Sequence, residues 1–350
     1  PRYEELLAAA DADPGLREAV AGELISSEIE IISGAGANLS AALAAQRERR
    51  GRLFALAASH GVELGATGTH PWADYREQPI IDTEHYHRVE EGLKYVAWRN
   101  NTFSLHVHVG VKGADRAIAV CDRVREVLPE LLAISASSPF TEGVDSGLAS
   151  SRSQHFTRMF PRCGIPDPFN DWKTYQDFVE FLVRTDSIVE STQLWWSVRP
   201  HHLYGTVEVR ICDAQPSGHD GTALAGLITA CVAQAARDFD ENRPFTPKTG
   251  RQLEENLWRA IRFGLDGKLI DLDRGEEYPA VQIAERLLTW TAPVRAELGI
   301  EPNLPEQGAT SRLREAAGDS PSAEKLRDVF AASLQETAAT YTGSAVPSGG

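Results

Sequence analysis

The chain has 350 residues, 42% of them hydrophobic and 24% charged, which is the composition of a folded protein with a substantial core. Its 35 Lys and Arg residues are outnumbered by 50 Asp and Glu residues. The resulting net charge of −15 argues against a general nucleic-acid binder, because contact with phosphates needs a basic surface. No apolar run approaches the roughly 18 residues that a membrane span requires.

The first half of the chain is predicted to mix strands with helices. Its clearest strand is 103–111, FSLHVHVGV, in which apolar and polar residues alternate. The other elements expected here, in chain order, are short helices in 1–21, a strand over 23–32, a helix over 38–60, a strand over 62–66, and helices over 83–99 and 114–127.

The second half is predicted to be mostly helical and follows a polar loop at 137–158. The elements expected here are a helix over 171–190, strands over 193–198 and 204–211, and helices over 220–240, 250–264, 280–297 and 309–339. Strands with one polar face, backed by helices, indicate an α+β fold with an antiparallel sheet. No change in composition divides the chain, so we expect one domain over 1–341 and a disordered tail, 342–350.

Cysteine usage indicates a reducing compartment. Four cysteines are widely separated and include no CxxC pair, so we expect a cytoplasmic protein in which none of them is a nucleophile or part of a disulfide. The sequence also lacks the GxxxxGK[ST], GxGxxG, HExxH and GxSxG motifs, which argues against P-loop, Rossmann, zincin and α/β-hydrolase chemistry. Candidate functional residues must therefore be sought on the polar faces of the predicted strands.

Two predicted strands carry pairs of polar residues two positions apart, so the members of each pair share one face. His106 and His108 form the first pair, and Glu208 and Arg210 form the second. Taken singly, these pairs have a simpler interpretation, as surface histidines and as an ion pair on a wet sheet. These four residues are candidates for a functional site only if the two strands that carry them are neighbours in the fold.

A third predicted strand adds the carboxylates of Glu23, Glu28 and Glu30, which alone indicate a solvated face. Carboxylates assisted by histidine suit Mg²⁺ or Mn²⁺, and the lack of thiolates at these positions argues against a soft metal. A hard divalent ion with arginines nearby indicates phosphate chemistry, in which the arginine binds oxygens through two parallel hydrogen bonds. Arg152 and Arg199 lie beside the strands and are the candidates for this role.

Seven motifs occur in an order that resembles a known family. They are GTHPW (68–72), HVHVG (106–110), SASSPF (135–140), ASSR (149–152), VRP (198–200), GTVEVRICD (205–213) and NLWRAIRFGLDG (256–267). Together they resemble the second glutamate–cysteine ligase family, the carboxylate–amine ligases of bacteria and archaea, over about residues 20–300. That family is similar in fold and chemistry to the catalytic domain of glutamine synthetase, in which ATP phosphorylates the γ-carboxylate of glutamate and an amine attacks the acyl phosphate.

The resemblance implies a role for each candidate. Glu23 and Glu30 correspond to ligands of one divalent ion, and His106 and Glu208 to ligands of a second. The remaining roles are phosphate contacts at His108 and Arg199, stabilisation of the transferred phosphoryl group by Arg210, and binding of the glutamate carboxylates by Thr69, His70 and Arg152. The implied cofactors are ATP and Mg²⁺ or Mn²⁺, and the implied partners are glutamate and an amine, cysteine by default.

The chain departs from the family at its start. The family opens with a strand carrying a G-[IV]-E-x-E pattern whose glutamates bind metal. No such segment precedes Glu23 and the chain begins with Pro1, so we expect this metal-binding strand to be missing. Two other functions stay open at this point: a metal-dependent hydrolase, which would need no ATP, and a non-catalytic paralogue that binds glutamate or nucleotide. A homo-oligomer is compatible with the sequence.

Overall fold

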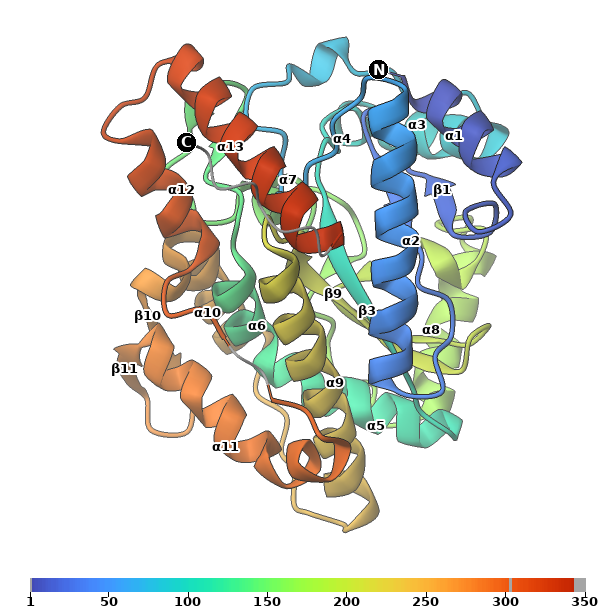
Figure 1. The fold of residues 1–350 in the computed structure, drawn as a ribbon. Coiled ribbons are helices and arrows are strands. Elements are labelled where there is room, and N and C mark those ends of the chain that lie inside the picture. The colour runs from blue at the N-terminus through green and yellow to red at the C-terminus, as the bar shows by residue number, and fades with distance from the viewer. Residues whose placement is uncertain (1, 302–303, 343–350) are drawn as a thin grey trace.

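The computed structural model describes residues 2–301 and 304–342 (Figure 1). The expected tail therefore falls outside the described residues except for Thr342, which ends the last helix. No helix within the described ranges is both long and apolar enough to cross a membrane. The strands are β1 (Val20–Gly22), β2 (Ile29–Ile31), β3 (Ser104–Gly110), β4 (Phe140–Thr141), β5 (Val144–Asp145), β6 (Cys163–Gly164), β7 (Trp195–Trp196), β8 (Val198–His201), β9 (Thr206–Asp213), β10 (Lys268–Asp271) and β11 (Glu276–Pro279).

The central sheet has three antiparallel strands in the order β3-β9-β8. Its strands form because apolar and polar residues alternate, which gives β9 a face of Val207, Val209 and Ile211 that is fully buried. The other strands pair two by two: β1 with β2, β4 with β5 and β10 with β11 are antiparallel, and β6 with β7 is parallel. The predicted α+β class with an antiparallel sheet is confirmed.

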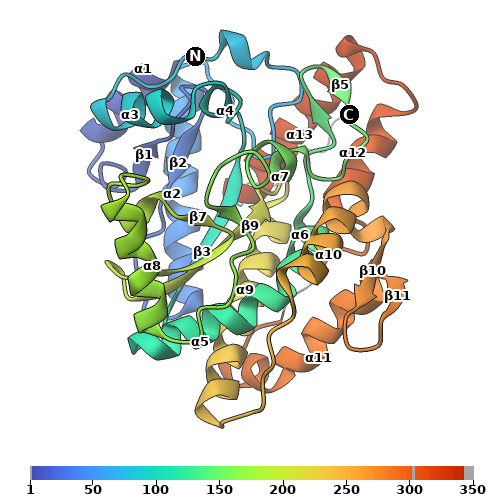
Figure 2. The ribbon, with the colours of Figure 1, turned by 180° about the vertical axis from the view of Figure 1, so that it is seen from behind.

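Helices cover the apolar face of this sheet. The helices are α1 (Tyr3–Ala12), α2 (Leu39–Ser59), α3 (Glu84–Leu93), α4 (Tyr95–Trp98), α5 (Ala114–Val124), α6 (Leu128–Ser135), α7 (Ser151–His155), α8 (Trp172–Arg184), α9 (Gly218–Asp240), α10 (Gly250–Phe263), α11 (Ala280–Leu298), α12 (Ala309–Ala317) and α13 (Ala323–Thr342). Figure 2 shows β3 and β9 with α5, α6 and α9 around them, and side chains of these elements form the largest hydrophobic cluster. The polar residues of the sheet therefore lie on the face that these helices do not cover.

Two predicted strands are wrong. Only the end of 23–32 is a strand, β2, which pairs with β1. The residues before it turn instead, since the amide of Ser26 bonds to the carbonyl of Pro79 (2.9 Å) and the amide of Glu28 to that of Ile25 (3.0 Å). Residues 62–66 have no ladder partner within the described ranges and form no strand. Alternation alone predicts a strand's side-chain pattern, whereas a ladder also needs a partner strand.

Two predicted helices are interrupted. The helix expected over 83–99 divides into α3 and α4 at Lys94, whose φ is +48°, and the helix expected over 309–339 divides into α12 and α13 at Gly318, whose φ is +73°. A positive φ cannot continue a right-handed helix. The sequence analysis also missed the β10–β11 hairpin, because charged residues break its alternation, and it missed α7 within the supposed loop 137–158.

Candidate active site

Glu208 lies at the centre of the polar face of the sheet and is only 2% exposed. Arg199 Nε donates to its Oε2 (2.6 Å), and Arg210 Nη1 donates to its Oε1. His108 Nε2 lies 3.5 Å and His106 Nδ1 3.9 Å from the same Oε1. The polar pairs predicted on separate strands therefore converge, because β3 and β9 are neighbours and His108 stands opposite Glu208. This face is a buried network and not the solvated one that the simpler interpretation implied.

Opposing effects set the protonation states in this network. Burial alone would raise the pKa of the Glu208 carboxyl, but the charges of Arg210 and Arg199 and a contact from His108 hold it well below its ordinary value. Burial, reinforced by the nearby Arg210 charge, holds the pKa of His106 well below its ordinary value. Glu208 is therefore ionised and His106 neutral near pH 7.

A β-bulge in β9 determines where Arg210 points. Leu105 pairs with Cys212 and Val107 with Val209, so two residues of β9, Arg210 and Ile211, stand opposite the single residue between them on β3. A bulge of this kind re-aims the side chains beside it. It places Arg210 Nη1 3.5 Å from Nδ1 of the imidazole opposite, while Arg210 Nε is buried without a hydrogen-bond partner among the described residues.

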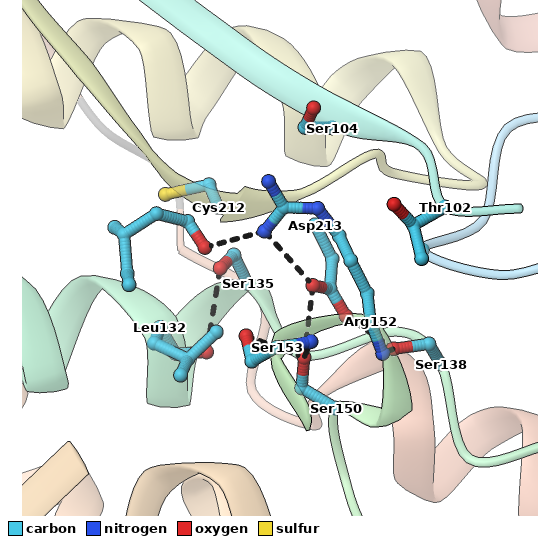
Figure 3. Close-up of polar contacts among 12 residues, drawn as sticks. Thr102, Ser104, Leu132, Ser135, Ser138, Ser150, Arg152, Ser153, Cys212 and Asp213 are labelled. Carbon is cyan, nitrogen blue, oxygen red and sulfur yellow. Dashed lines mark hydrogen bonds and ion pairs between the residues drawn. The ribbon is translucent and has the colours of Figure 1, made fainter. Parts of the chain in front are cut away.

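The bulge is held from behind by Arg152, whose guanidinium donates to the carbonyls of Ile211 (2.9 Å) and Arg210 (3.0 Å). Arg152 also lies 3.7 Å from the carboxylate of Asp213, and both side chains are buried (Figure 3). Burial raises the pKa of Asp213, and Arg152 opposes that rise. The geometry makes Arg152 a support of β9. Its predicted contact with glutamate stays a prediction.

Asp213, the partner of Arg152, also holds the loops that carry the SASSPF and ASSR motifs. It accepts hydrogen bonds from the amide of Ser137 (3.0 Å) and the hydroxyls of Ser138 (2.7 Å) and Ser150 (2.9 Å). Gly68 of the GTHPW loop packs so closely on it that a Cβ there would lie 2.6 Å from the carboxylate carbon of Asp213. The sequence analysis did not single out Asp213, although it closes the GTVEVRICD motif and the serines that bind it belong to two other motifs.

Arg199 is largely engaged within the protein. Besides its bond to the central carboxylate, its Nη1 donates to the carbonyls of Thr192 (2.8 Å) and Leu194 (2.6 Å), and it is buried. Its predicted contact with nucleotide phosphates stays a prediction. By comparison, the guanidinium of Arg210 keeps more of its donors free of protein acceptors.

A cavity of about 990 Å³ adjoins the network and is lined by residues of 23–31, α2, the 62–78 segment, β3 and α13. Glu23, Glu28 and Glu30 all line it. Burial and the charge of Glu30 raise the pKa of Glu23 to about 7, and burial raises the pKa of Glu28 and of Glu30 as well. Glu28 also accepts from the amide of Thr102 (2.9 Å). These residues therefore form an acidic wall rather than a solvated strand face.

The GTHPW loop presents only one of its two candidates to the cavity. His70 lines it, packs against Trp72 and Phe330, and has a pKa lowered to about 4 by burial, so its imidazole is neutral. The hydroxyl of Thr69 is buried and donates to the carbonyl of Phe140 (2.8 Å). The substrate contacts predicted for Thr69 and His70 stay predictions.

The donor chemistry of the site suits a hard divalent ion. Within residues 2–301 and 304–342, no three or more His, Cys, Asp or Glu side chains are grouped to hold an ion by themselves. The donors occur in pairs instead: Glu23 lies close enough to Glu30 to feel its charge, and His106 lies beside Glu208. Mg²⁺ commonly binds one or two carboxylates and takes its other ligands from water and substrate phosphates, so the pairs fit such an ion.

Comparisons with known proteins agree with the motifs. The model of glutamate-cysteine ligase family 2 matches residues 3–344. The protein named "Putative glutamate--cysteine ligase 2" of Solibacter usitatus is 39% identical over 284 residues, which cover 81% of this chain and 74% of that protein. Its namesake in Sorangium cellulosum is 39% identical over 316 residues, 90% and 82% of the two chains. "Putative glutamate--cysteine ligase 2-3" of Rubrobacter xylanophilus is 38% identical over 332 residues, 95% and 87%.

Proposed function

Since this chain belongs to glutamate–cysteine ligase family 2, we propose that it uses ATP to join the γ-carboxylate of glutamate to an amine, cysteine by default. In the first step a γ-carboxylate oxygen bonds to the terminal phosphorus of ATP, and ADP leaves. In the second step the amine nitrogen bonds to the acyl carbon, inorganic phosphate leaves with the electrons of the broken C–O bond, and the amine gives up a proton. Cysteine as the acceptor would make the product γ-glutamylcysteine.

The observation that carries this proposal is the position of Arg210. Its guanidinium is held by an ionised Glu208 on one side and faces a neutral His106 on the other, and its Nε has no acceptor in the part of the chain that the structure describes. A fixed guanidinium with unoccupied donors is suited to a phosphoryl group whose charge grows during transfer, because the donors are in place before the reaction begins. Glu208 thus positions the arginine, and the neutral imidazole leaves the local charge positive.

Glu23 with Glu30, and His106 with Glu208, are the residues that would hold divalent ions. When bound, such an ion neutralises phosphate oxygens. His108, whose side chain is a third exposed, would meet the nucleotide phosphates from the open side of the sheet. We further propose that the β3-β9-β8 sheet corresponds to the catalytic sheet of glutamine synthetase, and that the protein forms one catalytic domain, acts in the cytoplasm and needs no nucleic-acid partner or membrane.

A coupled assay of ADP formation tests the proposal. The chain is supplied with ATP, Mg²⁺, glutamate and a panel of amines that includes cysteine, and the expected result is ADP formation that requires both glutamate and an amine. Arg47→Lys, at an exposed position on α2 outside the cavity, is the matched control for Arg210→Lys. Substrate hydrolysis without ATP would favour the metal-dependent hydrolase. Glutamate binding with no turnover for any amine would favour the non-catalytic paralogue.

A further inference from the structure

Arg50 is a cation with no counter-ion among the described residues. It lies on α2, and its guanidinium forms no hydrogen bond or ion pair with any residue in the described ranges; its Nε is buried and unpartnered. Its neighbours on the helix behave differently, since Arg49 donates to the carbonyl of Ile32 (2.7 Å) and Arg52 pairs with Asp13. The residue is half-buried, and a charge partly removed from water is normally paired, because desolvation is unfavourable.

The one interaction that Arg50 makes within residues 2–301 and 304–342 leaves its donors free. Its guanidinium carbon lies 4.2 Å from the centre of the Tyr341 ring on α13, which packs against α2 (Figure 1). The Tyr341 hydroxyl is in turn fixed by a hydrogen bond to the carbonyl of Gln215. A cation–π contact orients the plane of the guanidinium but occupies none of its five N–H groups. The Arg50 guanidinium is therefore held in one orientation, and its N–H groups have no acceptor among the described residues.

Two further residues that line the cavity carry polar atoms with no hydrogen-bond partner among the described residues. Gln46 stands one helical turn earlier on α2, and its Nε2 bonds to the carbonyl of Ile31 (3.4 Å), while its Oε1 is one of these buried atoms. The other is Oγ of Ser26, which lies between β1 and β2. Because buried polar groups nearly always have partners, three without one around a single cavity indicate that the cavity is built to receive a polar ligand.

The surroundings define the chemistry of that ligand. A guanidinium with free parallel donors recognises a planar carboxylate through two hydrogen bonds. The carboxyl groups of Glu23, Glu28 and Glu30 line the same cavity and can accept hydrogen bonds from the donor groups of a ligand. A zwitterionic amino acid meets both conditions, since it brings one carboxylate for Arg50 and an ammonium group that Gln46 Oε1 can accept from.

We propose that Arg50, flanked by Gln46, binds the α-carboxylate of an amino-acid substrate. The choice of glutamate and cysteine as probes rests on the proposed ligase function, whereas the presence of a carboxylate subsite rests on the unpartnered guanidinium alone. The position lies on the α2 side of the cavity, and we expect the subsite to select and orient the amino acid without taking part in phosphoryl transfer.

Isothermal titration of L-glutamate and of L-cysteine into the full chain, without nucleotide, tests the subsite. Arg50→Gln should weaken binding of the bound amino acid by at least about 10-fold, the loss typical of one charged hydrogen bond, and Arg50→Lys should restore part of it. Arg47→Gln, the same change at an exposed position of the same helix, should bind as the wild type does. Thermal melting of each variant shows whether it is folded.

A second measurement needs no variant. The α-amides of the two amino acids remove only the carboxylate charge, so each should bind the wild type at least about 10-fold more weakly than its parent, and Arg50→Gln should no longer distinguish amide from acid. Equal affinity of acid and amide, unchanged binding by Arg50→Gln, or no binding of either amino acid to the wild type would each overturn the subsite.

The experiments distinguish a failure of the carboxylate subsite from a failure of the proposed ligase function. Binding that depends on Arg50 in a protein that forms no ADP would keep the subsite and reject the ligase. ADP formation with KM values for both amino acids unchanged in Arg50→Gln would keep the ligase and reject the subsite.

Discussion

Replacing each of the two arginines on Glu208 by lysine separates the phosphoryl-binding role from the structural one. Arg210→Lys keeps a positive charge that can still reach the carboxylate, but it loses the planar fork and the free Nε. Arg199→Lys also keeps the charge, but one ammonium group cannot replace three bonds that point to a carboxylate and to two separate carbonyls. The two substitutions are chemically identical and act on the same carboxylate, so each is the control for the other.

We expect Arg199→Lys to affect mainly stability and Arg210→Lys to affect mainly turnover. Arg199→Lys leaves at least one buried acceptor without a charged donor, a loss of about 1.5–3 kcal/mol, which in a protein of this length lowers the melting temperature by roughly 2–4 °C. Arg210→Lys should change stability by about 1 kcal/mol or less, since the ammonium can replace its one bond to the carboxylate. Turnover should fall by at least about 100-fold in Arg210→Lys, the effect of losing one preorganised transition-state donor.

The assay measures kcat, the KM for ATP and the melting temperature on the same preparations. Arg210→Lys should lower kcat with little change in KM or melting temperature. Arg199→Lys should lower the melting temperature and, if it also contacts the nucleotide, raise the KM for ATP while kcat stays within about 10-fold. The reasoning is refuted if Arg210→Lys turns over normally, or if it melts well below Arg199→Lys.

Three further predictions concern residues around this network. Burial and the charge of Glu30 raise the pKa of Glu23 from its ordinary 4.5 to about 7, so its ionisation destabilises the fold as pH rises between these values. With divalent ions chelated, Glu23→Gln should therefore raise the unfolding free energy by about 3 kcal/mol at pH 8 and by less than about 1 kcal/mol at pH 5. Equal effects at both pH values would contradict this. Asp213→Asn should lower the free energy of unfolding by about 3–5 kcal/mol, because it leaves the buried charge of Arg152 without its counter-ion. In a denaturant titration, the double variant Asp213→Asn/Arg152→Met should lose clearly less than the sum of the two single losses. Burial raises the pKa of Cys163 to about 11, so the native protein should react slowly with thiol reagents and Cys163→Ala should keep full turnover; rapid labelling or lost turnover would argue for a functional thiol.

The sequence contained enough information to place the central residues but not their environment. The alternation in 103–111 and 204–211 located His106 and Glu208 on one face each, and adjacency of the strands then brought them together. Alternation cannot show that this face is buried, because it reports which residues differ in polarity and not what covers them. Nor can it show a bulge, which depends on how two distant segments pair.

The site features that sequence reasoning missed are non-local. Asp213 gains its importance from serines 63 to 76 positions away, and the state of Arg50 depends on a ring nearly 300 residues later in the chain. A helical arginine such as Arg50 resembles any solvent-exposed arginine until the fold shows that no described residue pairs with it. The absence of disulfides could be predicted from the sequence, and all four cysteines are free. A buried free cysteine behaves as a small hydrophobic residue and needs no bonding partner.

The bulge in β9 has a consequence for how this strand can change in evolution or in the laboratory. Substitutions along the strand alter one side chain at a time, but deleting a single residue between Val209 and Cys212 would remove the bulge and leave one residue opposite His106. Cys212 would still pair with Leu105 and Asp213 with Ser104, so the residues behind the bulge would keep their faces, but the local bend that aims the Arg210 side chain would be lost. The strand should therefore accept changes of residue far more readily than a deletion here, and a sequence alignment that opens a gap at this point would misassign Arg210.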